Sequence, residues 1–187
     1  MIITPNVKVL QEHIDITKLR DVVLSIPEEE WDENPIRQQK FDTAKDTKAV
    51  IMKFNGPLVP SGDNPRKTDT FPPWEKYKHL VEPVINPVLD CFPPGILNKC
   101  MFARLKAGGE IGVHTDSNYT LGVSHRLHIP LVTNDDVIFM IDGVDYNLKE
   151  SKGYEINNVA THGVKNNSDT DRIHLLFDYF CPPEGME

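Results

Sequence analysis

Two side chains in the segment GVHTDSNY, residues 112–119, have the types and the spacing of metal ligands. His114 and Asp116 are two positions apart, so on an extended strand both side chains point to the same side. A neutral imidazole and a carboxylate on one face offer two adjacent ligands to a divalent cation. His162, in ATHGV, is the best-placed candidate for a third ligand. Two histidines and one carboxylate on one face of an octahedral metal leave three positions open, as in non-haem Fe(II) sites that bind a co-substrate and O2.

A cation follows the third candidate ligand. Arg172 lies ten positions after His162, across the polar segment KNNSDTD at 165–171. If residues 160–164 and 172–180 pair as antiparallel strands, Arg172 comes close to His162. A guanidinium in that place can bind a carboxylate through two parallel hydrogen bonds. The spacing therefore predicts a site for 2-oxoglutarate, with one end on the metal and the other on Arg172.

The motif HxD, then His, then Arg ten positions later resembles that of the 2-oxoglutarate/Fe(II) dioxygenases. The longer string HTDSNYTLGVSHRLHIPLVTNDD is similar to the aspartyl/asparaginyl β-hydroxylase branch, which includes bacterial proline hydroxylases, and the match covers roughly residues 98–181. The resemblance implies Fe(II), 2-oxoglutarate as co-substrate, and three iron ligands: His114, Asp116 and His162. Asp116 makes the chain closer to the proline-hydroxylase version, because some animal members of the branch lack the carboxylate ligand.

The pair Arg126 and His128, an RxH followed by IPL, matches a further feature of this branch. The resemblance implies that both side chains meet 2-oxoglutarate beside Arg172, although the block between His114 and Arg126 differs in length from that of some members. The implied reaction is hydroxylation of an amino-acid side chain of the Asp, Asn or Pro type, with O2 consumed and succinate and CO2 released. The substrate would be a free amino acid or a residue in a peptide or protein.

From residue 98 onward, the chain consists of short β-rich segments separated by turn signals. Eight strands are predicted, at residues 99–107, 110–116, 125–132, 137–141, 144–148, 153–159, 160–164 and 172–180. Their even spacing favours a mainly β, cupin-like jelly roll. The resemblance implies the same fold, a double-stranded β-helix with N-terminal helices against its larger sheet. We expect one domain over 1–187, with 1–97 as a helical and strand support region and 98–181 as the β core.

The support region carries fewer signals. The spacing of its apolar residues predicts a short helix over 17–26, and a second helix is predicted from Pro73, broken or kinked by Pro83 and Pro87. Residues 55–73 are rich in Gly, Pro, Asp and Asn, which indicates a long loop that serves as a lid, is disordered, or is a tolerated surface excursion. The other expectations are a strand at 48–54, a candidate strand at 7–10, a solvated acidic run at 28–30, and core positions for Trp31 and Trp74.

Composition limits the classes of function. The chain has 187 residues, with 39% hydrophobic and 26% charged, as in an ordinary globular protein. The net charge of −8 argues against a nucleic-acid partner. Three cysteines without a CxxC motif predict free thiols in a reducing compartment. Because there is neither a signal-peptide pattern nor an apolar run of membrane-spanning length, we expect a soluble cytoplasmic protein with no membrane partner.

Two other hypotheses fit the same residues. A cupin-type metal protein that does not use 2-oxoglutarate would leave Arg172 dispensable, and a non-catalytic jelly-roll binding module would hold its metal in a closed shell of four ligands. A nucleic-acid demethylase is disfavoured by the acidic charge. Asn118, Tyr119 and Arg104 are candidates for the substrate side, with a surface or structural role as the default for Arg104. The short segment after the last strand favours an open groove and a polypeptide substrate.

Overall fold

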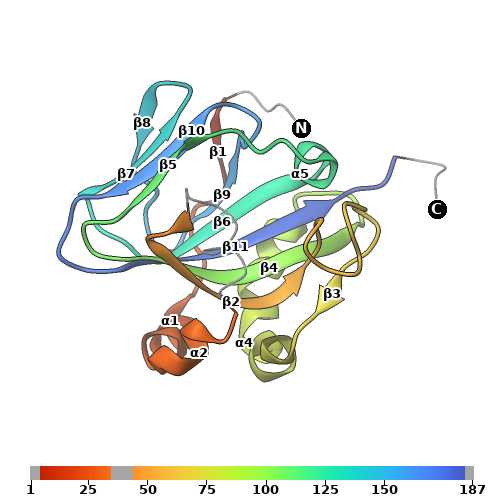
Figure 1. Ribbon diagram of the computed structural model, residues 1–187, viewed down its shortest axis with the longest axis horizontal. Helices are drawn as coiled ribbons and strands as arrows, with labels where there is room; N and C mark the ends of the chain where they lie inside the picture. Colours follow the sequence, from red (N-terminus) through yellow and green to blue (C-terminus); the bar gives the residue numbers. More distant parts are fainter. Residues whose placement is uncertain (1–4, 35–43, 184–187) are drawn as a thin grey trace.

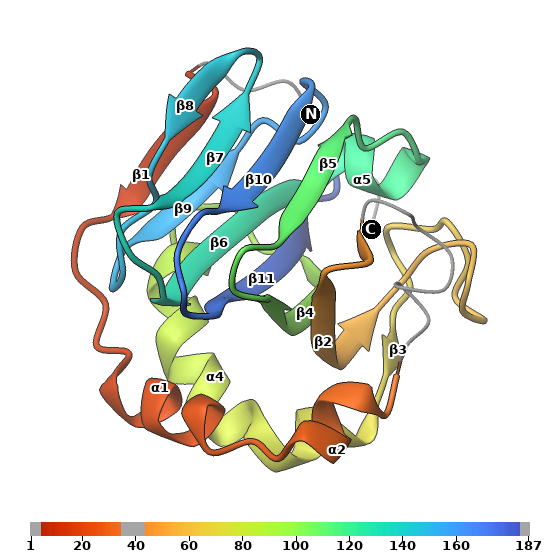
Figure 2. The same cartoon turned by 60° about the vertical axis from the view of Figure 1, so that its left-hand side comes forward.

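The computed structural model describes residues 5–34 and 44–183, and its two antiparallel sheets face each other (Figures 1 and 2). The larger sheet has the strand order β1 (Val7–Gln11), β9 (Gly153–Ile156), β6 (His125–Val132), β11 (Arg172–Phe180), β4 (Ile96–Leu105), β2 (Thr47–Phe54) and β3 (Asp69–Thr70). The smaller sheet has the order β5 (Glu110–His114), β10 (His162–Asn166), β7 (Val137–Ile141) and β8 (Val144–Tyr146). The helices are α1 (Thr17–Leu24), α2 (Glu28–Asp32), α4 (Pro72–Leu89) and α5 (Tyr119–Val123). This arrangement is the predicted cupin-like jelly roll.

The side chains of β11 point alternately to the two faces of the larger sheet. Its odd-numbered residues 173–179 pack with buried residues of α1 and α4 on one face of the larger sheet. Helices α1, α2 and α4 cover that face, on the side away from the smaller sheet (Figure 2). The even-numbered residues therefore point toward the smaller sheet: Arg172, His174, Leu176 and Asp178. Three polar side chains of one central strand are thus placed between the two sheets.

The antiparallel pairing of residues 160–164 with 172–180, which was the condition for bringing Arg172 next to His162, is not formed. Strand β10 pairs with β5 and β7, whereas β11 pairs with β4 and β6. The polar segment between them crosses from one sheet to the other, as jelly-roll connections do. His162 and Arg172 consequently lie on facing sheets, and not on neighbouring strands.

The support region differs from its predictions at two points: the helix is not broken at Pro83 and Pro87, and Glu30 of the acidic run is buried, whereas Glu28 and Glu29 are exposed as predicted. Helix α4 continues through Pro83 and Pro87 without the expected break, because Val81, Val84, Ile85 and Val88 of this helix are buried against the larger sheet and outweigh the missing hydrogen bonds. The acidic run 28–30 is the first turn of α2, where negative charge stabilises a helix N-terminus.

Glu30 within that acidic run is not solvated, since only 9% of it is exposed. Its carboxylate accepts hydrogen bonds from the Tyr77 hydroxyl at 2.8 Å and from Lys76 Nζ at 2.7 Å. Trp31 and Trp74 are buried in the same core, as predicted. Among the residues that the structure describes, no helix combines the length and the apolar character needed to cross a membrane.

Candidate active site

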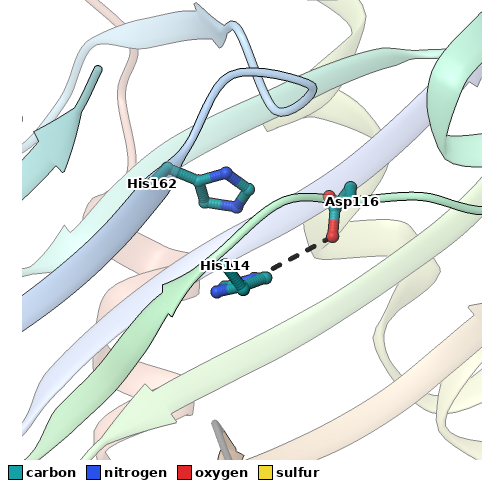
Figure 3. A group of neighbouring side chains, drawn as sticks. All are labelled: His114, Asp116 and His162. Carbon is teal, nitrogen blue, oxygen red and sulfur yellow. Dashed lines mark ion pairs between the residues drawn. The ribbon is translucent and has the colours of Figure 1, made fainter.

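The three predicted metal ligands come together at the paired ends of β5 and β10. His114 ends β5 and lies opposite His162, the first residue of β10, in the register of the two strands. Asp116 follows β5 after one residue, and its Oδ1 lies 3.9 Å from His114 Nε2 (Figure 3). One ligand atom from each residue lies within 4.8 Å of the others. The geometry fits a single divalent cation bound by two nitrogens and one oxygen.

The backbone fixes which nitrogen of each histidine is available. His114 Nδ1 lies 2.7 Å from the carbonyl oxygen of Gly112, and His162 Nδ1 lies 2.9 Å from that of Ala160. A carbonyl can only accept a hydrogen bond, so both Nδ1 atoms carry the hydrogen and both Nε2 atoms keep a free lone pair. Burial lowers the pKa of His162, which keeps this imidazole neutral. Both rings are therefore held in the tautomer that a metal ligand needs.

The third group, Asp116, is held at one of its two oxygens. Oδ2 lies 3.3 Å from Arg126 Nη2 and accepts a hydrogen bond of 3.1 Å from Asn158 Nδ2. Burial alone would raise the pKa of Asp116, but the charge of Arg126 and the Asn158 hydrogen bond outweigh it and keep the pKa below its ordinary value. Asp116 is thus an anion with Oδ2 engaged, and Oδ1 is the oxygen near His114.

Arg126 is part of a buried network of charges that sequence reasoning missed. Its Nε lies 2.5 Å from Asp178 Oδ1 and its Nη2 lies 3.1 Å from Asp178 Oδ2. Lys99 Nζ lies 3.2 Å from the same Oδ2, and the Asp178 side chain is fully buried. The signal was a lone Asp in the apolar strand RIHLLFDYF, since a buried carboxylate requires partners. Naming the partners required the strand register, which sets Asp178 opposite both cations.

Arg172 lies in a second polar cluster farther along β11. Its Nη2 lies 2.6 Å from His174 Nδ1, which in turn lies 3.3 Å from His128 Nδ1, and all three residues are buried. Since a guanidinium only donates, His174 Nδ1 accepts and its Nε2 carries the hydrogen. The Nε2 atoms of His174 and His128 are buried without a hydrogen-bond partner. The His174 Nε2–H is thus a buried donor without a partner beside the Arg172 guanidinium, which fits an anionic group that enters from outside. His174 is a member of this cluster that sequence reasoning missed.

This cluster makes stability depend on pH. Burial, together with the charge of Arg172, lowers the pKa of His128 and of His174 well below 6.5. As the pH falls below about 6.5, these histidines bind protons in the unfolded chain but not in the folded protein. The free energy of unfolding therefore falls as the pH is lowered. The loss is at most ~1.4 kcal/mol per pH unit for each histidine. Urea unfolding of metal-free protein between about pH 7.5 and 5.5 measures this slope. His174→Gln should reduce the slope and exposed His79→Gln should not; equal slopes in all three proteins would contradict the assignment.

A cavity of about 590 Å³ opens beside two of the three candidate ligands, His114 and Asp116. Its lining includes His114, Asp116, Arg126, Lys99 and, from the predicted long loop, residues 55–58. Arg172, His128 and His174 are among the described residues, but they do not line this cavity. The open space beside the triad therefore lies toward Lys99 and the loop, while the Arg172 cluster lies farther along β11.

The long loop forms a wall of this cavity and is fastened at several points. Asn55 Nδ2 donates to the carbonyl oxygens of Asn64 and Lys67, at 3.1 and 3.3 Å. Asp63 accepts hydrogen bonds of 2.8 Å from the backbone N–H groups of Tyr119 and Thr120 at the start of α5. These bonds connect the loop to the segment that follows Asp116, which favours the interpretation as a cover for the site over that of a surface excursion.

The three candidates for the substrate side have different positions. Asn118 lines the cavity, and its side chain also accepts a hydrogen bond from the Leu121 N–H to cap α5. Tyr119 is 63% exposed and does not line the cavity. Arg104 lies outside the cavity, hydrogen-bonded to Glu28 and with its guanidinium carbon 4.5 Å from the centre of the Trp31 ring. The structural default for Arg104 agrees with these contacts.

Comparison with known proteins gives the family. The family model described as aspartyl/asparaginyl beta-hydroxylase matches residues 76–182. No curated protein matches the chain. Among solved structures, an oxidoreductase of the 2OG-Fe(II) oxygenase family from Burkholderia pseudomallei superimposes with a TM-score of 0.60 at 13% identity, over 89% of this chain and 77% of that one, which indicates a shared fold.

A cupin domain from Bordetella pertussis matches 48% of this chain and 96% of its own, at 20% identity and a TM-score of 0.36. The family match covers more than half of the chain and includes all three predicted metal ligands together with Arg172. This chain belongs to the aspartyl/asparaginyl β-hydroxylase family and is an oxygenase.

Proposed function

We propose that the protein is an Fe(II)- and 2-oxoglutarate-dependent dioxygenase that hydroxylates an amino-acid side chain. The observation that carries this proposal is the convergence of one ligand atom from each of two histidines and one carboxylate within 4.8 Å, beside a cavity that His114 and Asp116 line. Residues His114, Asp116 and His162 would hold the iron, since their donor set suits Fe(II) and leaves positions open. When bound, the iron supplies the oxidation of a C–H bond by O2, coupled to the conversion of 2-oxoglutarate to succinate and CO2.

Arg172 would bind the carboxylate of 2-oxoglutarate that is remote from the metal. It is a buried cation on the larger sheet, and the unpartnered Nε2–H of His174 lies in the same cluster. Arg126 would assist at the metal end of the co-substrate, a role that the 3.3 Å between its Nη2 and Asp116 Oδ2 supports. The two arginines thereby orient 2-oxoglutarate along the larger sheet, and the surrounding apolar residues exclude water from the ion pairs.

The charges in the cavity favour a substrate with a carboxylate. Lys99 and Arg126 carry two positive charges, and Asp178 and Asp116 carry two negative ones. Bound Fe(II) would be neutralised by Asp116 and by the metal-end carboxylate of 2-oxoglutarate, so one positive charge in the cavity would lack a counter-ion. Burial lowers the pKa of Lys99 while Asp178 opposes this, and a substrate anion would stabilise the charged ammonium further.

Replacing Lys99 with Met should reduce the preference for acidic substrates. A lost charge-assisted hydrogen bond of ~1.5–3 kcal/mol corresponds to roughly a 10- to 100-fold loss of discrimination. The measurement is substrate-dependent succinate formation with matched pairs, Asp against Asn and Glu against Gln, offered as free amino acids and in capped peptides. Lys53→Met on the same sheet, outside the cavity lining, is the control. A wild type that prefers the amides, or an unchanged preference in Lys99→Met, would contradict this substrate class.

The proposed reaction is tested by succinate formation. Purified protein with Fe(II), O2 and 2-oxoglutarate should form succinate, slowly without a substrate and faster with one. Omission of iron or O2 should abolish the product. If iron is bound but no succinate is formed with any member of the substrate panel, the cupin-type alternative without 2-oxoglutarate takes precedence.

A further inference from the structure

We propose that Asp178 is a positioning residue that acts through Arg126 to decide which oxygen of Asp116 faces the metal. The inference rests on the metal centre proposed above and extends it to a residue that contacts none of the three ligands in the described contacts. Asp178 lies on β11 of the larger sheet, whereas the ligands lie at the ends of β5 and β10 of the smaller sheet.

The contacts form a chain across the interior. Both oxygens of Asp178 bind Arg126, at 2.5 Å to Nε and 3.1 Å to Nη2, and these residues are partners in the register of β11 and β6. The same Nη2 of Arg126 lies 3.3 Å from Asp116 Oδ2. Because the guanidinium is planar and bound at two points, its orientation is fixed by the sheet and not by Asp116.

As a result, the two oxygens of the Asp116 carboxylate have different surroundings. Oδ2 is engaged by Arg126 and by Asn158 Nδ2, while Oδ1 is the oxygen that lies 3.9 Å from His114 Nε2. A metal placed among the three ligands would therefore meet Oδ1. The arrangement selects binding through one oxygen and keeps the remaining metal positions free.

The charge of Asp178 is needed for this arrangement. Arg126 is only 11% exposed in its side chain, and Asp178 and Asp116 are the two carboxylates that contact it in the described structure. Without the charge of Asp178, Asp116 would become the sole counter-ion of a buried guanidinium. The guanidinium would then compete with the metal for both oxygens of Asp116.

Metal affinity of Asp178→Asn is the direct test, since Asn keeps the shape and removes the charge. Fe(II) affinity is measured anaerobically by competition with a chelating dye, and Co(II) absorption at saturation reports the ligand arrangement. Partners of metal ligands typically contribute ~10–100-fold to affinity. We expect a loss in this range and an altered Co(II) spectrum. Asp145→Asn, which removes the charge of an exposed carboxylate on β8 outside the cavity lining, should leave Fe(II) affinity within about threefold of wild type and the Co(II) spectrum unchanged.

A double-variant cycle separates positioning from a general structural role. If Asp178 acts through Arg126, Arg126→Gln/Asp178→Asn should bind Fe(II) no more weakly than Arg126→Gln alone. This comparison also holds if Asp178→Asn alone does not fold. Wild-type affinity and spectrum in Asp178→Asn, or a further tenfold loss in the double variant, would overturn the inference. Failure of the metal centre itself is distinguishable, because wild type and His114→Ala would then bind Fe(II) equally.

Discussion

Asp116→Ala is expected to bind Fe(II) at least ~100-fold more weakly than wild type, and to form no succinate at iron concentrations that saturate wild type. The substitution removes the one anionic ligand of the candidate centre. It also leaves the buried Arg126 cation beside the metal, with Asp178 as its remaining carboxylate. The measurement is anaerobic titration of Fe(II) against a chelating dye, followed by succinate analysis.

Asp145→Ala is the matched control for this prediction. Asp145 is an exposed carboxylate on β8 of the same sheet and is not among the residues that line the cavity. Its removal changes net charge by the same amount and should leave iron affinity unchanged. Iron affinity at or above wild type in Asp116→Ala would show that Asp116 is not a ligand, and the active centre would have to be assigned to the histidines alone.

Arg172→Met is expected to raise the 2-oxoglutarate concentration needed for half-saturation by at least ~30-fold. Truncating one partner of a buried, hydrogen-bonded charge pair typically costs ~2–5 kcal/mol. The effect should vanish with 2-oxopentanoate, which keeps the metal-binding end and has a methyl group in place of the remote carboxylate. Comparing both compounds in wild type and variant isolates the contact between Arg172 and that carboxylate.

Arg20→Met controls for the loss of an arginine, because Arg20 lies on α1 with 43% of its side chain exposed and pairs only with Glu150 among the described ion pairs. It should leave half-saturation unchanged. Equal losses of affinity for 2-oxoglutarate and 2-oxopentanoate in Arg172→Met would indicate a general disturbance of the sheet. No loss for either compound would leave Arg172 dispensable, as the cupin-type alternative requires.

Much of the β core could be predicted from sequence because its strands are short, apolar and bounded by turn residues. Strands β6, β7 and β11 occupy the predicted residues 125–132, 137–141 and 172–180. The neighbouring strands of β10 and of β11 could not be predicted in the same way. The alternation of apolar and polar residues defines the two faces of a strand but not which strands lie beside it. Two successive strands therefore have the same sequence pattern whether they form a hairpin or lie in different sheets. Helix α4 shows a similar limit, since burial of one face overrides two internal prolines.

In the candidate site, too, local features could be predicted from sequence and contacts between distant segments could not. HxD spacing places His114 and Asp116 on one side of a strand end because that geometry is local. The arrangement that holds Asp116 is not local, since Asn158 and Arg126 come from other segments and Asp178 is 62 positions along the chain. Helix α5 has only five residues, too few to show an apolar periodicity, and sequence reasoning did not predict it. The candidate ligands could therefore be named from sequence, whereas the residues that hold Asp116 in place required the register of the sheets.

The most direct test of the account is anaerobic titration of 2-oxoglutarate into the Fe(II)-loaded protein while following the weak visible charge-transfer band of the chelate. The proposed site should give a band that appears in wild type and saturates with one equivalent bound, is absent in His162→Ala, and requires far more co-substrate in Arg172→Met. No band in wild type with iron demonstrably bound would contradict the use of 2-oxoglutarate and, with it, the proposed reaction.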